Sequence, residues 1–144
     1  MNKALHIEDV QVGTELPTLK RFVDTPRLVM YAGAEEDWYR GHYDHVYATS
    51  IGFPAVFGHG WLTFAFLMNV ATDWMGPDGT VRSARCRYIR PAFPGTELTC
   101  KGVVTAKGRG DGEELATLEL QAVDPNGQTL ASAEAVVALP NRGE

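Results

Sequence analysis

The stretch FGHGWLTFAFLMNVATDW, residues 57–74, is apolar throughout and carries no charge before Asp73. It predicts a helix that is hydrophobic on every side, and such a helix lies inside a protein rather than on its surface. The breakers Gly-Pro-Asp-Gly at residues 76–79 end this helix. The rest of the chain is therefore expected to fold around one central helix.

After residue 79 the pattern changes from helix to strand. The sequences Gly-Arg-Gly-Asp-Gly at residues 108–112 and Asp-Pro-Asn-Gly at residues 124–127 are typical of hairpin turns. With the turn Pro-Ala-Phe-Pro-Gly at residues 91–95, they separate four segments. These segments predict an antiparallel meander of strands over Thr80–Arg90, Leu98–Lys107, Leu115–Val123 and Thr129–Leu139.

The residues before the central helix predict a strand and two shorter helices. A strand over about residues 12–24 is followed by a helix that Asp24 or Thr25 caps. The segment Trp38–Tyr43 is expected to be a loop, and a second short helix then runs through Ser50. The order of elements predicts an α+β fold, with an antiparallel sheet wrapped around the long helix.

Composition restricts the class of protein. A chain of 144 residues with 44% hydrophobic and 22% charged residues suits one globular domain over residues 1–144. The net charge of −5 disfavours nucleic acid or an anionic membrane surface as a partner.

The chain shows no targeting or membrane signal. Its N-terminus lacks the apolar region of a secretory signal, and the nearly uncharged run from Gly58 to Thr72 is too short to cross a bilayer. Cys86 and Cys100 form neither a CxxC pair nor a disulfide framework, which suits a reducing compartment. A cytoplasmic location is expected.

The segment EDWYRGHYDH, residues 36–45, places Asp37 and His42 five positions apart without a helical or strand period. A carboxylate beside an imidazole forms an acid–base couple, in which the carboxylate orients the ring. The alternative is that Asp37 caps a helix and His42 is a polar surface residue. The spacing alone leaves both interpretations open.

A metal site is not expected, although His42, Asp44, His45 and His59 lie close together in the sequence. The chain has no HExxH motif, no cysteine near these histidines and no second set of ligands.

Gly58 and Gly60 open the central helix, where unpaired backbone N–H groups and the helix dipole favour negative charge. Such an end can hold an anion or polarise a carbonyl oxygen as it becomes an oxyanion. The two glycines can equally serve to start the helix close to the sheet.

Four arginines, at positions 82, 85, 87 and 90, lie on the strand predicted after the helix. Strand alternation places Arg85 and Arg87 on one face and the other two on the opposite face. They suggest a ligand that carries phosphate, or simply a solvated face of the sheet.

Read together, residues 31–37, 42–44 and 59–62 resemble the MaoC-like, or (R)-specific, enoyl-CoA hydratases and dehydratases. The stretch DWYRGHYD, residues 37–44, keeps the first Asp, the His and the last Asp of that family's D-x-N-P-x-H-x-D motif. The stretch RPAFPGTEL, residues 90–98, resembles its RPVxPGDTL turn. The chain departs from the pattern at Tyr39-Arg40, which replace Asn-Pro, and at Met68, where many members have serine.

The resemblance implies the hotdog fold and the hydration of a trans-2-enoyl-CoA to a 3-hydroxyacyl-CoA, or the reverse. It implies that Asp37 and His42 hold the water and that the Gly60 N–H stabilises the thioester oxygen. Residues expected to contact the substrate are Tyr39, His59, Trp61, Arg85 and Arg87.

No cofactor is expected beyond the coenzyme A of the substrate. The resemblance also implies a homodimer or higher homo-oligomer, or a heteromer with a related hotdog chain. The sequence ATDWMGPDGTVRS after the helix is most similar to the branch that acts on bulky, steroid-type acyl-CoAs.

Two other functions stay open. A hotdog thioesterase commonly carries a carboxylate on the central helix, whereas residues 60–72 contain no Asp or Glu. A non-catalytic, acyl-CoA-binding subunit of a heteromeric hydratase would tolerate the replacement of the Asn-Pro pair.

Overall fold

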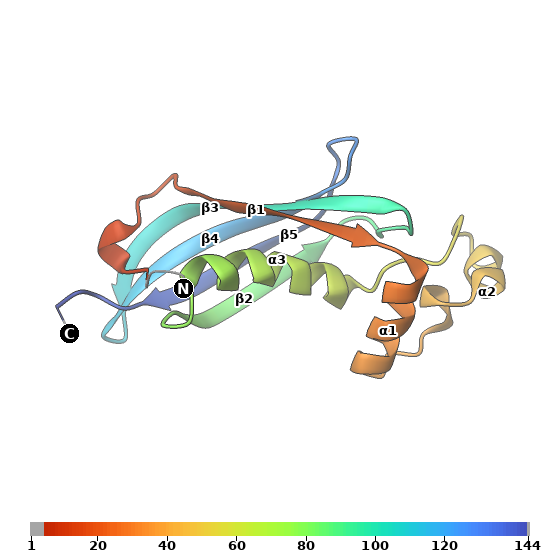
Figure 1. The fold of residues 1–144 in the computed structure, drawn as a ribbon, viewed down its shortest axis with the longest axis horizontal. Coiled ribbons are helices and arrows are strands. Elements are labelled where there is room, and N and C mark those ends of the chain that lie inside the picture. The colour runs from red at the N-terminus through yellow and green to blue at the C-terminus, as the bar shows by residue number, and fades with distance from the viewer. Residues whose placement is uncertain (1–4, 144) are drawn as a thin grey trace.

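The apolar stretch forms helix α3, Gly60–Met75, which lies along one face of a five-stranded sheet (Figure 1). A computed structural model describes residues 5–143; residues 1–4 and 144, at the ends of the expected domain, lie outside the described residues. The strands are β1 Glu15–Val23, β2 Thr80–Tyr88, β3 Thr96–Gly110, β4 Glu113–Val123 and β5 Thr129–Leu139.

The sheet is antiparallel at every pairing, in the order β1-β3-β4-β5-β2. Strand β1 pairs with β3 at one edge, and β2 pairs with β5 at the other. The expected α+β architecture, with an antiparallel sheet around a long helix, is confirmed.

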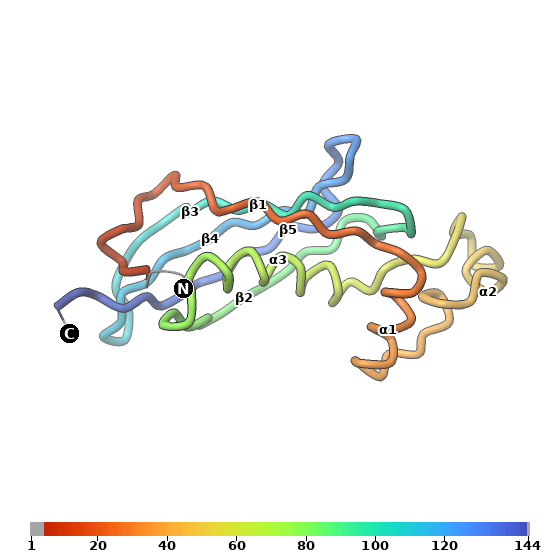
Figure 2. Tube along the Cα trace, viewed as in Figure 1, coloured from red at the N-terminus to blue at the C-terminus, as the bar shows by residue number. Residues whose placement is uncertain are grey.

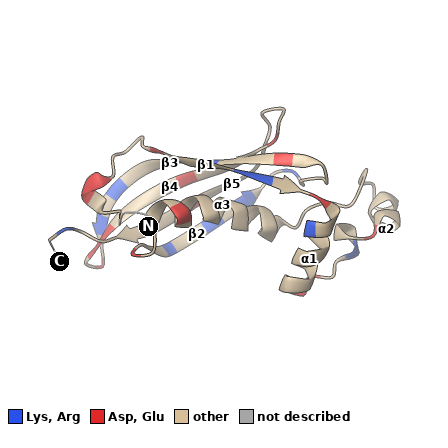
Figure 3. Ribbon diagram, viewed as in Figure 1, with Lys and Arg blue, Asp and Glu red and all other residues tan. Residues whose placement is uncertain are grey.

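The core lies between α3 and the inner face of the sheet. Along β4 the buried residues alternate with more exposed ones, as in a strand with one face in the core. They are Ala116, Leu118, Leu120 and Ala122, and Leu67 of α3 is completely buried in the same core. Asp73 is the only charged residue in α3, all of which is described (Figure 3).

Helix α1, Thr25–Glu35, and helix α2, His45–Ser50, lie beyond the end of α3 where the chain enters that helix (Figure 2). The Asp24 carboxylate caps α1 by accepting from the Arg27 N–H at 2.8 Å. The Asp44 carboxylate caps α2 by accepting from the Tyr47 N–H at 3.0 Å. Both caps satisfy donors that a helix start leaves unpaired.

Several boundaries differ from the expected ones, among them the starts of β1, β3 and β4. The segment Trp38–Tyr43 contains a short 3-10 helix, Arg40–His42. Strand β2 ends at Tyr88 rather than at Arg90. Strand β3 runs to Gly110, because its pairing with β4 continues up to the tight turn between them. None of the described helices is long and apolar enough to span a membrane.

The segment before β1 is held by a side chain from the far end of β3. The Lys107 ammonium donates to the backbone carbonyls of Ile7, at 2.7 Å, and Val10, at 2.6 Å. These contacts join residues about a hundred positions apart in the chain. They close one end of the core beneath residues 7–10.

Candidate active site

The imidazole of His42 is buried, and a backbone contact determines its orientation. Its Nδ1 atom lies 2.7 Å from the carbonyl oxygen of Phe57. Because a carbonyl only accepts hydrogen bonds, Nδ1 carries the hydrogen and the neutral ring presents its lone pair at Nε2. That Nε2 atom lies 3.7 Å from Oδ2 of Asp37.

Asp37 stands at the opening of the site. Its side chain is 40% exposed, compared with 9% for the side chain of His42. Its Oδ1 atom accepts from the Tyr39 N–H at 3.2 Å, which leaves Oδ2 directed toward the imidazole. A gap of 3.7 Å is longer than a direct hydrogen bond and suits two groups that share a water.

Aromatic rings enclose His42 on several sides. The His59 ring stacks on it at 3.7 Å between centroids, and the Phe57 and Tyr39 rings meet it edge-on at 5.1 and 5.5 Å. Gly41 makes this arrangement possible. A Cβ atom there would lie 2.7 Å from the Tyr39 ring and 2.8 Å from the Phe57 ring.

Tyr39 and Arg40, which stand where the resemblance would place Asn-Pro, both contact the Tyr47 ring beside His42. Arg40 donates twice to the Asp44 carboxylate, at 2.7 and 3.1 Å, and its guanidinium lies 4.7 Å from the centre of the Tyr47 ring. Hydrogen bonds from the Tyr47 backbone and from Arg40 hold the pKa of Asp44 below its ordinary value. Asp44 is therefore a capping and ion-pairing residue.

His59 stands at the N-cap of α3 without capping it through its side chain. It is 1% exposed, and neither ring nitrogen has a hydrogen-bond partner among the described residues. Burial lowers its pKa and the neighbouring His42 lowers it further, whereas Asp37 and Glu35 oppose both effects. The Tyr31 ring meets it edge-on at 5.0 Å, and burial together with Glu35 raises the pKa of Tyr31 to about 12.

The start of α3 opens into a groove of about 320 Å³. Tyr88 of β2 covers Gly60 so closely that a Cβ on this glycine would lie 3.1 Å from the ring. Gly58 packs against the β2–β3 connection, and its N–H donates to the Ala92 carbonyl at 2.7 Å. Residues that line the groove include His42, Gly60, Thr63, Tyr88, Ile89 and Arg90.

The arginines divide between two places. Arg85 is paired with Glu134 at 2.8 Å and stands opposite it in the sheet. Glu134 is exposed between the buried Ala133 and Ala135, so Glu134 and the Arg85 opposite it lie on the face of the sheet away from α3. Arg87 shares that outer face, and only Arg90, beyond the end of β2, lines the groove at His42.

Trp61, Tyr39 and Tyr88 lie at different distances from the groove. Trp61 is 59% exposed on α3, next to Phe64, and lies outside the groove lining. The Tyr39 ring meets the rings of His42 and Tyr47 edge-on, at 5.5 and 5.8 Å between centroids. Tyr88 could not be recognised as a site residue from the sequence, since strand pairing brings it over Gly60.

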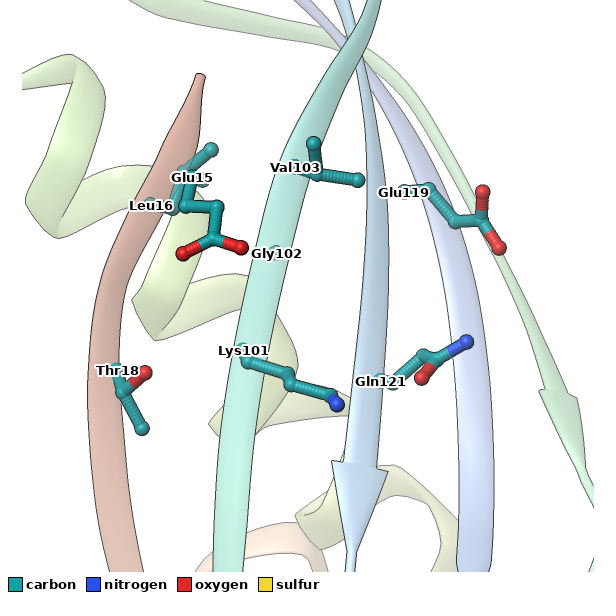
Figure 4. Close-up of a pocket in the computed structure, with 8 residues that line it drawn as sticks. All are labelled: Glu15, Leu16, Thr18, Lys101, Gly102, Val103, Glu119 and Gln121. Carbon is teal, nitrogen blue, oxygen red and sulfur yellow. The ribbon is translucent and has the colours of Figure 1, made fainter. Parts of the chain in front are cut away.

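Another hollow, of about 310 Å³, lies over β1, β3 and β4 on the face of the sheet away from α3 (Figure 4). Its lining includes Glu15, Lys101, Glu119 and Gln121, and none of the expected site residues. Exposed polar side chains of this kind are ordinary for the solvated face of a sheet.

Asp37, His42 and His59 each offer one potential metal ligand, and these atoms lie within 4.8 Å of one another. The ring planes of His42 and His59 differ by only 25°. Imidazole binds a metal through a lone pair in the plane of its ring, and two stacked rings direct these lone pairs almost in parallel. The arrangement therefore fits one cation poorly unless a ring rotates.

A family model described as a MaoC like domain matches residues 9–124. None of the curated proteins compared with the chain matches it significantly. Similar solved structures include the ChsH1-ChsH2 complex from Mycobacterium tuberculosis, at 26% identity and a TM-score of 0.81 over 90% of this chain and 98% of that one.

An (R)-hydratase from A. caviae involved in PHA biosynthesis is also 26% identical, with a TM-score of 0.81 over 92% of this chain and 99% of that one. The R-hydratase PhaJ1 from Pseudomonas aeruginosa, 21% identical over 95% of this chain and 86% of that one, shows the same fold at a TM-score of 0.84. The expected hotdog fold is confirmed.

Proposed function

Because the chain belongs to the MaoC-like domain family, we propose that it hydrates a trans-2-enoyl-CoA to a 3-hydroxyacyl-CoA, or catalyses the reverse dehydration. The observation that carries this proposal is the pair formed by Asp37 and His42. Their facing atoms are 3.7 Å apart, beside the start of a helix with free N–H groups. The (R)-hydratase from A. caviae, 26% identical to this chain, supports the same class of reaction.

In the proposed reaction, water lies between the Asp37 carboxylate and Nε2 of His42. As the water oxygen bonds to C3 of the enoyl group, one member of the pair removes its proton. That proton is then passed on to C2, so that H and OH add across the double bond from the same side. Proton transfer of this kind contributes about 10²–10⁴-fold to the rate.

The thioester oxygen gains negative charge as C3 is attacked. The backbone N–H of Gly60 is the proposed donor to this oxygen, because the first N–H groups of a helix have no acceptor within it. The absence of a side chain at Gly60 keeps this helix end open beneath the Tyr88 ring.

Coenzyme A brings phosphates to the opening of the groove. We assign their proposed contact to Arg90, which lines the groove and is held by Gln128 Oε1 at 2.8 Å. Arg85 and Arg87, expected from the sequence to contact substrate, face away from α3 and are therefore candidates only for a surface outside the groove.

The acyl group and the assembly are further parts of the proposal. Resemblance of residues 71–83 to the branch for bulky acyl-CoAs favours a large, steroid-type acyl group. Strand β2 pairs with a neighbour along one edge alone, and the exposed side of α3 carries a single charged residue, Asp73, which favours pairing with a second hotdog chain. This chain can be a copy or, as in the ChsH1-ChsH2 complex, a different one.

The test is the change in enoyl-CoA absorbance with purified protein on short, long and sterol-like substrates, beside Asp37→Asn. We expect turnover that falls by at least about 10²-fold in the variant while acyl-CoA binding persists. Folded wild-type protein that binds acyl-CoA without turnover would favour the non-catalytic subunit. Release of free coenzyme A would instead indicate a thioesterase.

A further inference from the structure

The buried imidazole of His59 is the polar group that the proposed mechanism leaves without a role. It is 1% exposed, and both ring nitrogens lack a hydrogen-bond partner among the described residues. Buried polar atoms are almost always hydrogen-bonded, because an unpaired donor or acceptor loses its contact with water. A side chain kept in this state requires a specific explanation.

Two structural explanations do not account for an imidazole here. His59 occupies the N-cap of α3, where Ser, Thr, Asp or Asn would bond to the helix, but its side chain makes no such bond. It stacks on His42 and meets the edge of Tyr31, contacts that a phenylalanine ring makes equally well. The ring nitrogens are therefore the feature to explain.

Those nitrogens lie next to the acid–base pair. One nitrogen of His59, one nitrogen of His42 and one carboxylate oxygen of Asp37 form a triangle with no side longer than 4.8 Å. The centre of a triangle of that size is roughly 2.8 Å from each corner, which is a hydrogen-bond distance. One water molecule at this centre can contact all three groups.

We propose that His59 is the third group that holds the reacting water, together with Asp37 and His42. The inference rests on the proposed hydration and adds a donor to it. The water uses its two O–H groups on two acceptors, the Asp37 carboxylate and Nε2 of His42. A third partner must therefore donate, and neutral imidazole has one N–H for this purpose.

The charges around His59 are consistent with a neutral donor. Tyr31 and Glu35 approach it from α1, and Asp37 and His42 from the following loop. Burial and the neighbouring His42 lower its pKa by more than Asp37 and Glu35 raise it, so the net direction is downward. The N–H of His59 then occupies one lone pair of the water and leaves the other directed at C3. In the dehydration direction, the same N–H donates to the departing hydroxyl oxygen.

The stacked rings suit a water better than a metal ion. Hydrogen bonds tolerate a donor or acceptor direction tilted out of the ring plane far better than coordination does. The 25° angle between the two rings lets both reach a shared water without rotation.

Two substitutions separate a hydrogen-bonding role from a packing role. His59→Phe keeps the stacked ring and removes the N–H, whereas His59→Gln keeps an N–H donor and removes the ring. We expect His59→Phe to lower kcat by about 10- to 100-fold with little change in KM, and His59→Gln to recover part of the loss. The opposite order, with His59→Phe near wild type and His59→Gln impaired, would overturn the inference. His45→Phe makes the same change at an exposed position of α2 and is the matched control, which should leave kcat unchanged.

A crystal structure of the wild-type protein at high resolution tests the inference independently of turnover. We expect an ordered water within hydrogen-bond distance of Asp37, His42 and His59, and its loss in His59→Phe. A site without this water would overturn the inference even if His59→Phe fails to fold. If the wild-type protein turns over no enoyl-CoA, the proposed hydratase function is wrong. The crystal structure still decides separately whether His59 holds a water.

Discussion

The Nδ1 atom of His42 lies 2.7 Å from the carbonyl oxygen of Phe57, two residues before the N-cap of α3. The segment that leads into the central helix therefore also sets the tautomer of the imidazole. The ring turns Nε2 toward Asp37, and His59, the N-cap itself, stacks on its face. The start of α3 and the Asp37–His42 pair form one structural unit.

Gly41→Ala tests how tightly this unit is packed. The added Cβ would lie within 3 Å of the Tyr39 and Phe57 rings, so we expect a loss of about 1–3 kcal/mol in the free energy of unfolding. Turnover should fall as well, because the shifted rings move His42. Urea denaturation and kcat measure the two effects.

Gly33→Ala is the control, since a Cβ there meets the Trp38 ring at an ordinary 3.6 Å within α1. Alanine favours a helix over glycine by up to about 1 kcal/mol, so this variant should be as stable as wild type or more so. Equal stability of the two variants would contradict the packing argument.

Arg90→Gln is expected to raise KM for an acyl-CoA by roughly 10-fold and to leave kcat nearly unchanged. The guanidinium lines the groove beside His42, where it can pair with a phosphate as substrate and transition state bind alike. Arg87→Gln, on the outer face, should leave KM within about 2-fold of wild type. A larger increase in KM for Arg87→Gln than for Arg90→Gln, measured by steady-state kinetics, would show that Arg87 rather than Arg90 contacts the phosphates.

Acid should destabilise the protein in part through His59. Its pKa is lowered in the folded protein, so below the ordinary histidine value of about 6.5 the unfolded chain takes up a proton that the folded chain does not. The stabilisation is fully present above that pH and is lost as the pH falls through the folded-state pKa.

In His59→Gln this contribution is absent, so the free energy of unfolding should depend less on pH between about 7 and 5. Denaturation curves at a series of pH values give the slope, with His45→Gln as the exposed control. An unchanged slope in His59→Gln would mean that His59 titrates alike in the folded and unfolded chain.

Lys107→Met should loosen the segment before β1. It leaves the carbonyls of Ile7 and Val10 without their shared donor, at a cost of about 1 kcal/mol. We expect faster amide hydrogen exchange in residues 5–14, with turnover unaffected because the site is at the other end of α3. Lys101→Met, on the same strand, is the control. Equal exchange in both variants would show that Lys107 does not hold the segment before β1 in place.

Much of the fold followed from local signals in the sequence. The uncharged run at residues 57–74 and the breakers after it predicted α3, and the turn residues at 124–127 predicted the β4–β5 hairpin. Element ends were less accurate. The length of β3 depends on how far its ladder with β4 continues, and that pairing is a contact between two segments rather than a property of either.

The features of the site also fall into those set by local sequence and those set by tertiary packing. By itself, the sequence determined the residue types and the spacing of Asp37 and His42, and placed His59 and Gly60 at a helix start. It also determined that Arg85 and Arg87 share a face, because strand alternation is local. Only the tertiary structure decided that this face points away from α3, that Tyr88 covers Gly60 and that Phe57 orients His42. Local propensities act within a few residues, whereas these relations depend on how the whole sheet packs around α3.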